Sequence, residues 1–307
     1  MDLNKFSYKV YLPTLKKYGV FYEFNGDQYL TIAKYIQNDD NPHVVQFFNK
    51  LVTELCVNNQ VLNGITRIDL FCILLNMRIL CVSDKMEMML RPNDENEHPQ
   101  KIVFDLYDIL DRVTNYEMDY TQIIKIDKGV KVKLKSPSEL YMDTSDQVIS
   151  SIIDTLYILD KKYDFTKLNK TQQKTVLNSL PSSVLTGITD RVNEIDKNYS
   201  INVLDGEQFK LVAERDAVDF NLRMYDNSFY EFLKLLYGCN LEEQYYIRYL
   251  MVKQMGFNLS DVSINPPHIT NTYINLFRKE LDEQKKQSEK NNNPTGGMSL
   301  PQQNFTQ

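Results

Sequence analysis

The chain has 307 residues, of which 42% are hydrophobic and 25% are charged, the proportions of an ordinary globular protein with a sizeable core. Its formal net charge of −6 disfavours broad electrostatic binding to nucleic acid, because phosphate binding needs a cationic surface. No apolar run approaches the roughly 20 residues of a membrane helix, and the start of the chain, with an acid at Asp2, lacks an apolar signal region. We therefore expect a cytoplasmic protein without a membrane partner.

The first third of the chain predicts strands followed by helices. Apolar and polar residues alternate over residues 6–12 and 20–24, which is typical of strands, and a turn follows at Asn25-Gly26. One helix should begin at about Asp27 and a second at Asn41-Pro42, where Asn caps and Pro suits the first helical position.

A third helix, from Thr66 to about Leu80, is apolar nearly all round, as expected for the centre of a core. Thr66 and Asp69 resemble a capping box. Asp69 and Arg78 also suit opposite ends of the helix dipole, so we interpret both charges as structural.

The middle of the chain predicts more short elements: strands at 85–90 and 101–105, a helix at 107–113, and a hairpin of residues 122–126 and 130–135 around Lys128-Gly129. The hairpin carries a basic ribbon of Lys125, Lys128, Lys131, Lys133 and Lys135. Lysines commonly protect exposed sheet edges, and the ribbon lacks aromatic residues for base stacking. We favour a solvated edge, with nucleic-acid binding as the alternative.

Residues 145–196 show helical rather than strand patterns and predict a helical insertion. An amphipathic helix is predicted from Val148 to Leu159, followed by helices at 170–179 and 183–195. Strand patterns return at 201–204, 208–212 and 218–224.

The C-terminal part predicts a helical hairpin with a third helix laid against it. Helix-start signals occur at Ser228 and Asn240, and stop signals at Gly238 and Gly256. The last helix should follow Pro267, with four residues inward: Ile269, Tyr273, Leu276 and Phe277.

Six residues of the C-terminal part are not explained by this core. No side chain after Lys290 is charged, and the segment is too poor in apolar surface to fold alone, so it is either a disordered tail or a peptide that orders on a partner. We predict partner binding by three tyrosines of the helices and three apolar residues of the tail, namely Tyr230, Tyr245, Tyr246, Met298, Leu300 and Phe305.

The residues give little support for catalysis. No phosphate-binding glycine loop or Gly-x-Ser-x-Gly elbow occurs. The candidate ligands are three histidines, four cysteines and three acids: His43, His98, His268, Cys56, Cys72, Cys81, Cys239, Asp105, Asp108 and Asp111. None has metal-ligand spacing. We interpret the histidines as surface or cap residues, the cysteines as reduced core residues, and Asp105 as a helix cap. No catalytic, cofactor or metal site is predicted.

The order of elements resembles the baseplate hub assembly proteins of T4-like contractile-tailed bacteriophages. The segments that carry the resemblance are Tyr11-Leu-Pro13, Ile65 to Arg78, Ile102 to Leu110, the hairpin ending at Pro137, and Phe220-Asn-Leu into Ser228-Phe-Tyr-Glu-Phe-Leu. Some members of that family have closely spaced cysteines in the middle strands, which suggest zinc; this chain has none. The resemblance implies a non-enzymatic role in building the hub, in the host cytoplasm and with other hub or tail proteins as partners. The alternative is a distributed-site enzyme or a nucleic-acid-binding protein that uses hairpin 125–135.

The predicted fold class is α+β. We expect a mixed strand and helix domain (1–144), a helical insertion that returns to sheet strands (145–224), a C-terminal helical module (225–282) and a flexible tail (283–307).

Overall fold

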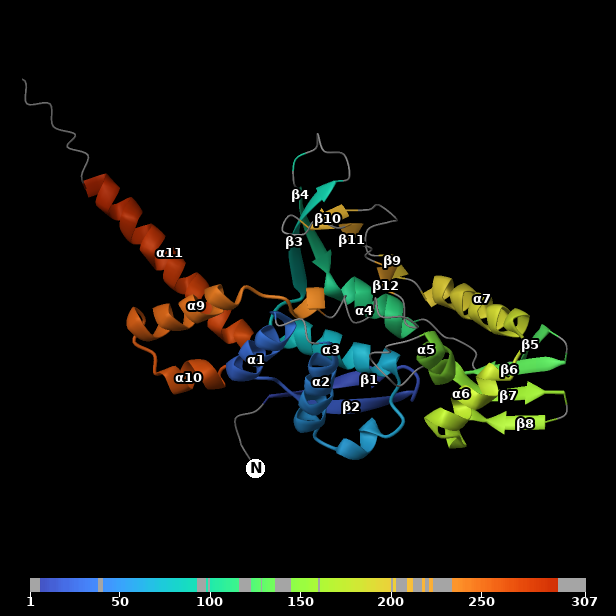
Figure 1. Ribbon diagram of the computed structural model, residues 1–307. Coiled ribbons are helices and arrows are strands. Elements are labelled where there is room, and N and C mark those ends of the chain that lie inside the picture. The colour runs from blue at the N-terminus through green and yellow to red at the C-terminus, as the bar shows by residue number, and fades with distance from the viewer. Residues whose placement is uncertain are drawn as a thin grey trace, which may run out of the picture.

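The computed structural model describes residues 6–37, 41–92, 98, 100–115, 123–127, 129–135, 145–159, 161–199, 201–202, 209–211, 217–218, 221–222 and 234–291. It confirms the α+β class, since helices pack on small antiparallel sheets (Figure 1). A group of C-terminal helices lies at one end of the molecule and a four-stranded sheet at the other, with the buried helix α3 (Arg67–Cys81) between them (Figure 1).

The first four elements are those predicted. Strands β1 (Ser7–Leu12) and β2 (Lys17–Tyr22) pair antiparallel, and helices α1 (Gly26–Gln37) and α2 (Asn41–Leu55) follow. Asn25 caps α1, because its side-chain oxygen accepts from the Gln28 N–H at 2.9 Å while the Gln28 side chain accepts from the Asn25 N–H. Local side-chain bonds of this kind satisfy the free donors of a helix start.

Helix α3 (Arg67–Cys81), which follows a 3-10 turn at Asn59–Leu62, is the centre of the core. Its apolar residues are almost fully buried, as its sequence predicted. Asp69 accepts from the Thr66 N–H at 2.9 Å, the reciprocal bond of a capping box. Asp69 also accepts from the Thr14 N–H at 3.0 Å and from the Thr14 hydroxyl, which ties the β1–β2 turn to this helix.

A sheet of order β11-β10-β3-β4 joins distant parts of the chain. Its strands are β3 (Lys85–Pro92), β4 (Gln100–Asp105), β10 (Phe209–Leu211) and β11 (Ala217–Val218). Helix α4 (Leu106–Asn115) follows β4, and β9 (Ile201–Asn202) pairs with β12 (Asn221–Leu222). The strands predicted at 85–90, 101–105 and 208–212 are confirmed, and β9 begins where the strand predicted at 201–204 begins. The single strand predicted at 218–224 is instead divided between β11 and β12, which pair in different sheets.

The second four-stranded sheet, of order β5-β6-β7-β8, corrects one prediction. Its strands are β5 (Ile123–Asp127), β6 (Val130–Leu134), β7 (Ile153–Ile158) and β8 (Lys161–Asp164). The helix predicted from Val148 to Leu159 is wrong in its second half, because α5 (Ser145–Ile152) ends where β7 begins. Apolar pairing across the sheet, such as Leu156 with Val132, outweighs the helical spacing.

The same sheet crosses residue 144, where the sequence predicts a domain boundary. Strands β5 and β6 come from one side of that boundary and β7 and β8 from the other. After β8 come a 3-10 turn at Phe165–Lys167 and the predicted helices α6 (Lys170–Asn178) and α7 (Ser182–Tyr199). The division into domains stays a prediction.

The C-terminal helices are α9 (Leu241–Lys253), α10 (Leu259–Ile264) and α11 (Pro267–Asn291), preceded by helical residues 234–237. The Asn240 side chain caps α9 by accepting from two N–H groups, and Gly256, with a φ of 76°, follows its end. Both local signals are confirmed. Helix α10 was not predicted, and α11 continues to Asn291, into the segment predicted as tail. The predicted start at Ser228 lies outside the described residues.

Candidate docking surface of the C-terminal helices

Two of the six predicted partner-binding residues lie together on α9. Tyr245 is 48% exposed and Tyr246 is 58% exposed, so both side chains are available to a partner. Tyr230, Met298, Leu300 and Phe305 lie outside the described residues.

The exposed surface of α9 is wider than the sequence predicted. Tyr249, 57% exposed, and Val252 lie three to seven residues beyond the two predicted tyrosines, which places all four on one side of the helix. We call Tyr245, Tyr246, Tyr249 and Val252 the tyrosine face. The spacing of Tyr249, four residues after Tyr245, is the signal that sequence reasoning passed over.

The opposite side of α9 is buried. Ile247 and Met251 belong to a small hydrophobic cluster with Val262 of α10 and Ile274 of α11. Helix α9 is therefore apolar on both sides. The described part of the chain buries only one of them; on the other, Lys34 of α1 lies over the Tyr245 ring, 5.8 Å from its centroid, and the side stays exposed. An apolar surface of this kind on a soluble protein commonly marks an interaction site.

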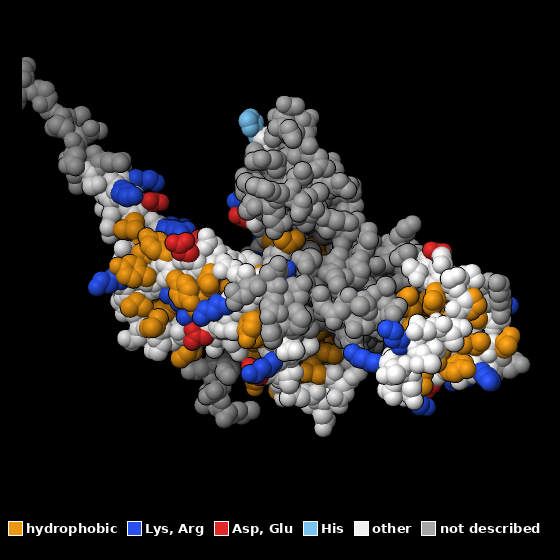
Figure 2. Space-filling view, viewed as in Figure 1, with side chains coloured by type: hydrophobic (Ala, Val, Ile, Leu, Met, Phe, Trp, Pro, Cys, Tyr) orange, Lys and Arg blue, Asp and Glu red, His pale blue; other side chains and the backbone are white. Residues whose placement is uncertain are grey.

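Helix α11 corrects the predicted inward face. Ile274 is buried, whereas Tyr273 and Leu276 are exposed, and Ile269 and Phe277 are only half-buried. One residue along a helix is a rotation of about 100°, so the small cluster can hold only one narrow stripe of α11. Phe257 also packs against this cluster, and its ring lies 5.1 Å from that of Tyr273. Figure 2 shows hydrophobic side chains gathered over these C-terminal helices.

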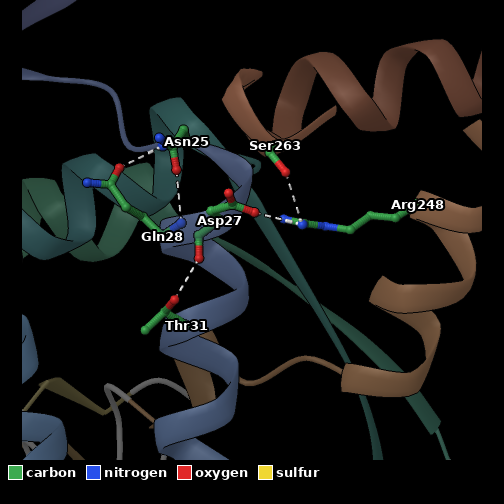
Figure 3. Close-up of polar contacts among 6 residues, drawn as sticks. All are labelled: Asn25, Asp27, Gln28, Thr31, Arg248 and Ser263. Atoms are coloured by element: carbon green, nitrogen blue, oxygen red, sulfur yellow. Dashed lines mark hydrogen bonds and ion pairs between the residues drawn. The ribbon is translucent and has the colours of Figure 1, made fainter. Parts of the chain in front are cut away.

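An ion pair holds α9 against α1 (Figure 3). Arg248 donates from Nη1 to Asp27 Oδ1 at 2.7 Å and to Ser263 Oγ at 3.4 Å, so one guanidinium joins three helical segments. The Arg248 side chain is 15% exposed and that of Asp27 is 59% exposed. Because the Asp27 carboxylate is open to water, the pair adds about 0–1 kcal/mol, and therefore orients α9 more than it stabilises the fold.

The backbones of α1 and α10 also meet directly. The Gly26 N–H donates to the Asn265 carbonyl oxygen at 2.9 Å, and a Cβ on Gly26 would lie 2.9 Å from the Val262 carbonyl oxygen. A side chain cannot fit there, so glycine sets this approach. The neighbouring hollow, lined in part by Tyr29, Arg248 and Asn271, has room for little more than a water molecule.

Outside this region, the candidate metal-ligand residues are helix caps or surface side chains. Asp105 caps α4 by accepting from the Tyr107 N–H at 2.9 Å, as predicted, and Asp108 and Asp111 are exposed. His98 is exposed and His268 lies half-buried in the first turn of α11, while the His43 side chain is outside the described residues. Among the side chains that the structure describes, no group of three or more His, Cys, Asp or Glu could hold a metal ion.

The cysteines are core residues with poorly reactive thiols. Cys56, Cys72 and Cys81 are buried and Cys239 is half-buried, all four as free thiols. Burial raises the pKa of Cys81 to about 12 and raises the pKa of Cys72 further. Since the thiolate is the reactive form, these two residues are not poised as nucleophiles.

Only the first strand of the basic hairpin, β5 with Lys125, is the sheet edge that the sequence predicted. Strand β6, with Lys131 and Lys133, lies between β5 and β7, so it is central, and the edges are β5 and β8. Lys133 pairs with Asp154 at 3.2 Å, and Lys128 lies outside the described residues. None of the helices in the described ranges is long and apolar enough to cross a membrane.

A family model described as T4 bacteriophage base plate protein matches residues 4–208, about two thirds of the chain. The chain belongs to this family. No curated protein and no solved structure matches it. Family membership assigns this baseplate protein a structural or assembly role in the phage tail, with other tail proteins as partners. The matched span ends before α9, so the tyrosine face of this baseplate protein lies outside it.

Proposed function

We propose that this baseplate protein acts in the assembly of the baseplate hub, or as a subunit of it, by docking onto other hub or tail proteins. The role is non-enzymatic and is exercised in the host cytoplasm during assembly. Family membership supports the baseplate role. The hub is proposed because the order of elements resembles hub assembly proteins.

The tyrosine face is the observation that carries the docking proposal. Three tyrosines on one side of a helix give a partner large, rigid apolar rings with a polar tip, the residue type that interfaces favour. The tyrosine face is held in place from behind, because Ile247 and Met251 are buried and Arg248 is bonded to Asp27. A partner would therefore meet a surface that is already ordered, which lowers the entropy lost on binding.

Co-purification from infected cells tests the proposal. A tagged protein should bring down hub or tail proteins, identified by mass spectrometry, and the variant Tyr245→Ser/Tyr249→Ser should lose them by tenfold or more, since central tyrosines are frequent hot spots (about 2 kcal/mol or more each). The matched control is Tyr107→Ser on α4, which is 45% exposed. Recovery of the tagged protein as a monomer without tail proteins would count against the proposal.

A second measurement distinguishes a subunit of the hub from a protein that acts only during assembly. Mass spectrometry of purified virions should detect the protein if it is a hub subunit. If it acts only during assembly, the protein should be present in infected cells and absent from virions.

A further inference from the structure

Three lysines and a tyrosine form a row across one face of the β5–β8 sheet. The strand register places Lys125 opposite Lys131, Lys131 opposite Tyr157, and Tyr157 opposite Lys162. Residues directly opposite in antiparallel strands share a face. We call Lys125, Lys131, Tyr157 and Lys162 the lysine row. Tyr157 supplies an aromatic side chain that the hairpin sequence alone does not contain.

The lysine row lies on the outer face of the sheet. Val130, Val132 and Leu134 alternate with the lysines of β6 and are buried, so they mark the inner face. Helix α7 packs on that inner side, since a Cβ on Gly187 would lie 2.7 Å from Ile126 of β5. All three lysines of the row are exposed, and Tyr157 is partly exposed.

In the next row of the same face, charged side chains are paired within the chain. That row contains Lys133, Thr155 and Asp164, opposite one another. Lys133 pairs with Asp154 at 3.2 Å, and Asp164 pairs with Lys167 at 3.1 Å. In the described ranges, by contrast, Lys125, Lys131 and Lys162 form no ion pair.

Without a bound anion, two cations of the lysine row repel each other across neighbouring strands. Like charges directly opposite each other destabilise a sheet, and Lys125 faces Lys131. Protection of a sheet edge explains lysines on β5 and β8, but Lys131 lies on a central strand. A row of cations without an ion pair to the residues that the structure describes, beside carboxylate-paired ones, favours a place for carboxylates from another molecule.

We propose that the lysine row docks an acidic segment of a partner protein, with carboxylates spread over about 14 Å, the width of three strand spacings. Tyr157 contributes its ring and a hydroxyl donor between the cations. A protein segment is favoured over nucleic acid because Asp154 and Asp164 border the row and the chain is acidic overall, at −6. A long phosphate chain binds through many cationic contacts, which a surface bordered by acids does not extend beyond the row, whereas a short acidic segment needs only the row itself.

This surface is separate from the docking surface of the proposed function. The β5–β8 sheet and the C-terminal helices lie at opposite ends of the molecule (Figure 1). The lysine row also lies within the residues that match the family, whereas the tyrosine face does not. Failure of one surface therefore does not imply failure of the other.

Fluorescence anisotropy with a labelled oligoglutamate tests the lysine row on the full chain. A peptide of about ten residues spans about 33 Å when extended and covers the row. At about 50 mM salt, where screening is weak, the variant Lys125→Gln/Lys131→Gln/Lys162→Gln should bind about tenfold more weakly, since it removes three exposed ion pairs with the peptide, each of modest strength. The control Lys170→Gln/Lys174→Gln/Lys286→Gln removes the same charge from exposed helix positions and should change binding less than twofold.

Three results would overturn the proposal: no binding of the peptide, equal loss in the two triple variants, or row-dependent binding of a labelled oligothymidine of similar length that is as tight as that of the peptide. The last result would identify a nucleic-acid surface instead. If the triple variant loses its folded circular dichroism spectrum, the single variant Lys131→Glu replaces it, because this side chain is exposed and its reversal should also weaken peptide binding.

Discussion

The hydroxyl of Tyr237 donates a hydrogen bond to the carbonyl oxygen of Leu74, 163 residues earlier in the chain. Tyr237 is fully buried, and its ring lies 5.2 Å from that of Phe48 and 6.3 Å from that of Phe24. Next to it, Arg78 Nε donates to the Leu236 carbonyl oxygen at 2.9 Å. These contacts fasten the start of the C-terminal helices to α3, and so connect the tyrosine face to the part of the chain that matches the family.

Tyr237→Phe should destabilise the protein by about 1–2 kcal/mol, because it removes a buried hydrogen bond and keeps the ring. Urea unfolding followed by circular dichroism measures the change. Tyr249→Phe, on the exposed side of α9, is the matched control and should leave the midpoint unchanged. Equal midpoints for Tyr237→Phe and the unchanged protein would show that the bond contributes nothing.

Asp69→Ala should cost more, about 2–5 kcal/mol. The carboxylate is buried and accepts from the N–H groups of Thr14 and Thr66, which would lose their acceptor. Thermal unfolding is a suitable measurement. The exposed Asp111→Ala should stay within about 0.5 kcal/mol, and a similar loss in both variants would contradict the role assigned to Asp69.

Gly26→Ala should loosen the junction of α1 with α10 at a cost of about 1–3 kcal/mol, because the new methyl group meets backbone oxygen atoms that cannot move independently. Hydrogen exchange should rise in α9, α10 and α11. Gln37→Ala, at the exposed end of α1, serves as control. Unaltered exchange in those helices would mean that the junction tolerates a side chain.

Alkylation should leave Cys81 unmodified in the folded protein at pH 8. With a pKa of about 12, roughly one thiol in ten thousand is ionised at that pH. The folded pKa lies above the unfolded value of about 8.5. The neutral thiol therefore contributes stability that is present below pH 8.5 and is lost as the pH rises toward 12. Mass spectrometry after iodoacetamide treatment, with and without urea, measures the labelling.

Cys239 is the internal comparison for this experiment, since it is only half-buried. It should label ahead of Cys81 and Cys72. Labelling of Cys81 in the folded protein as fast as that of Cys239 would show that α3 opens readily.

The elements that the sequence predicts correctly are those decided by neighbours in the chain. The caps of α3 and α9 depend on residues within three positions of the helix start, and the hairpin of β5 and β6 depends on its turn and its alternation. The same reasoning found Tyr245 and Tyr246 as exposed residues but passed over Tyr249, since nothing local says how much of a helix its neighbours will cover.

The elements that the sequence does not predict are those for which distant segments compete for the same residues. Residues 153–158 are compatible with a helix, and only pairing with β6 and β8 makes them a strand; that pairing in turn places Tyr157 between Lys131 and Lys162. The sequence by itself determined the α+β class, most element boundaries and the density of tyrosines in the C-terminal helices. The tertiary structure alone decided which side of α9 and α11 is buried and which lysines share a face, because burial and register arise from contacts between residues far apart in the chain.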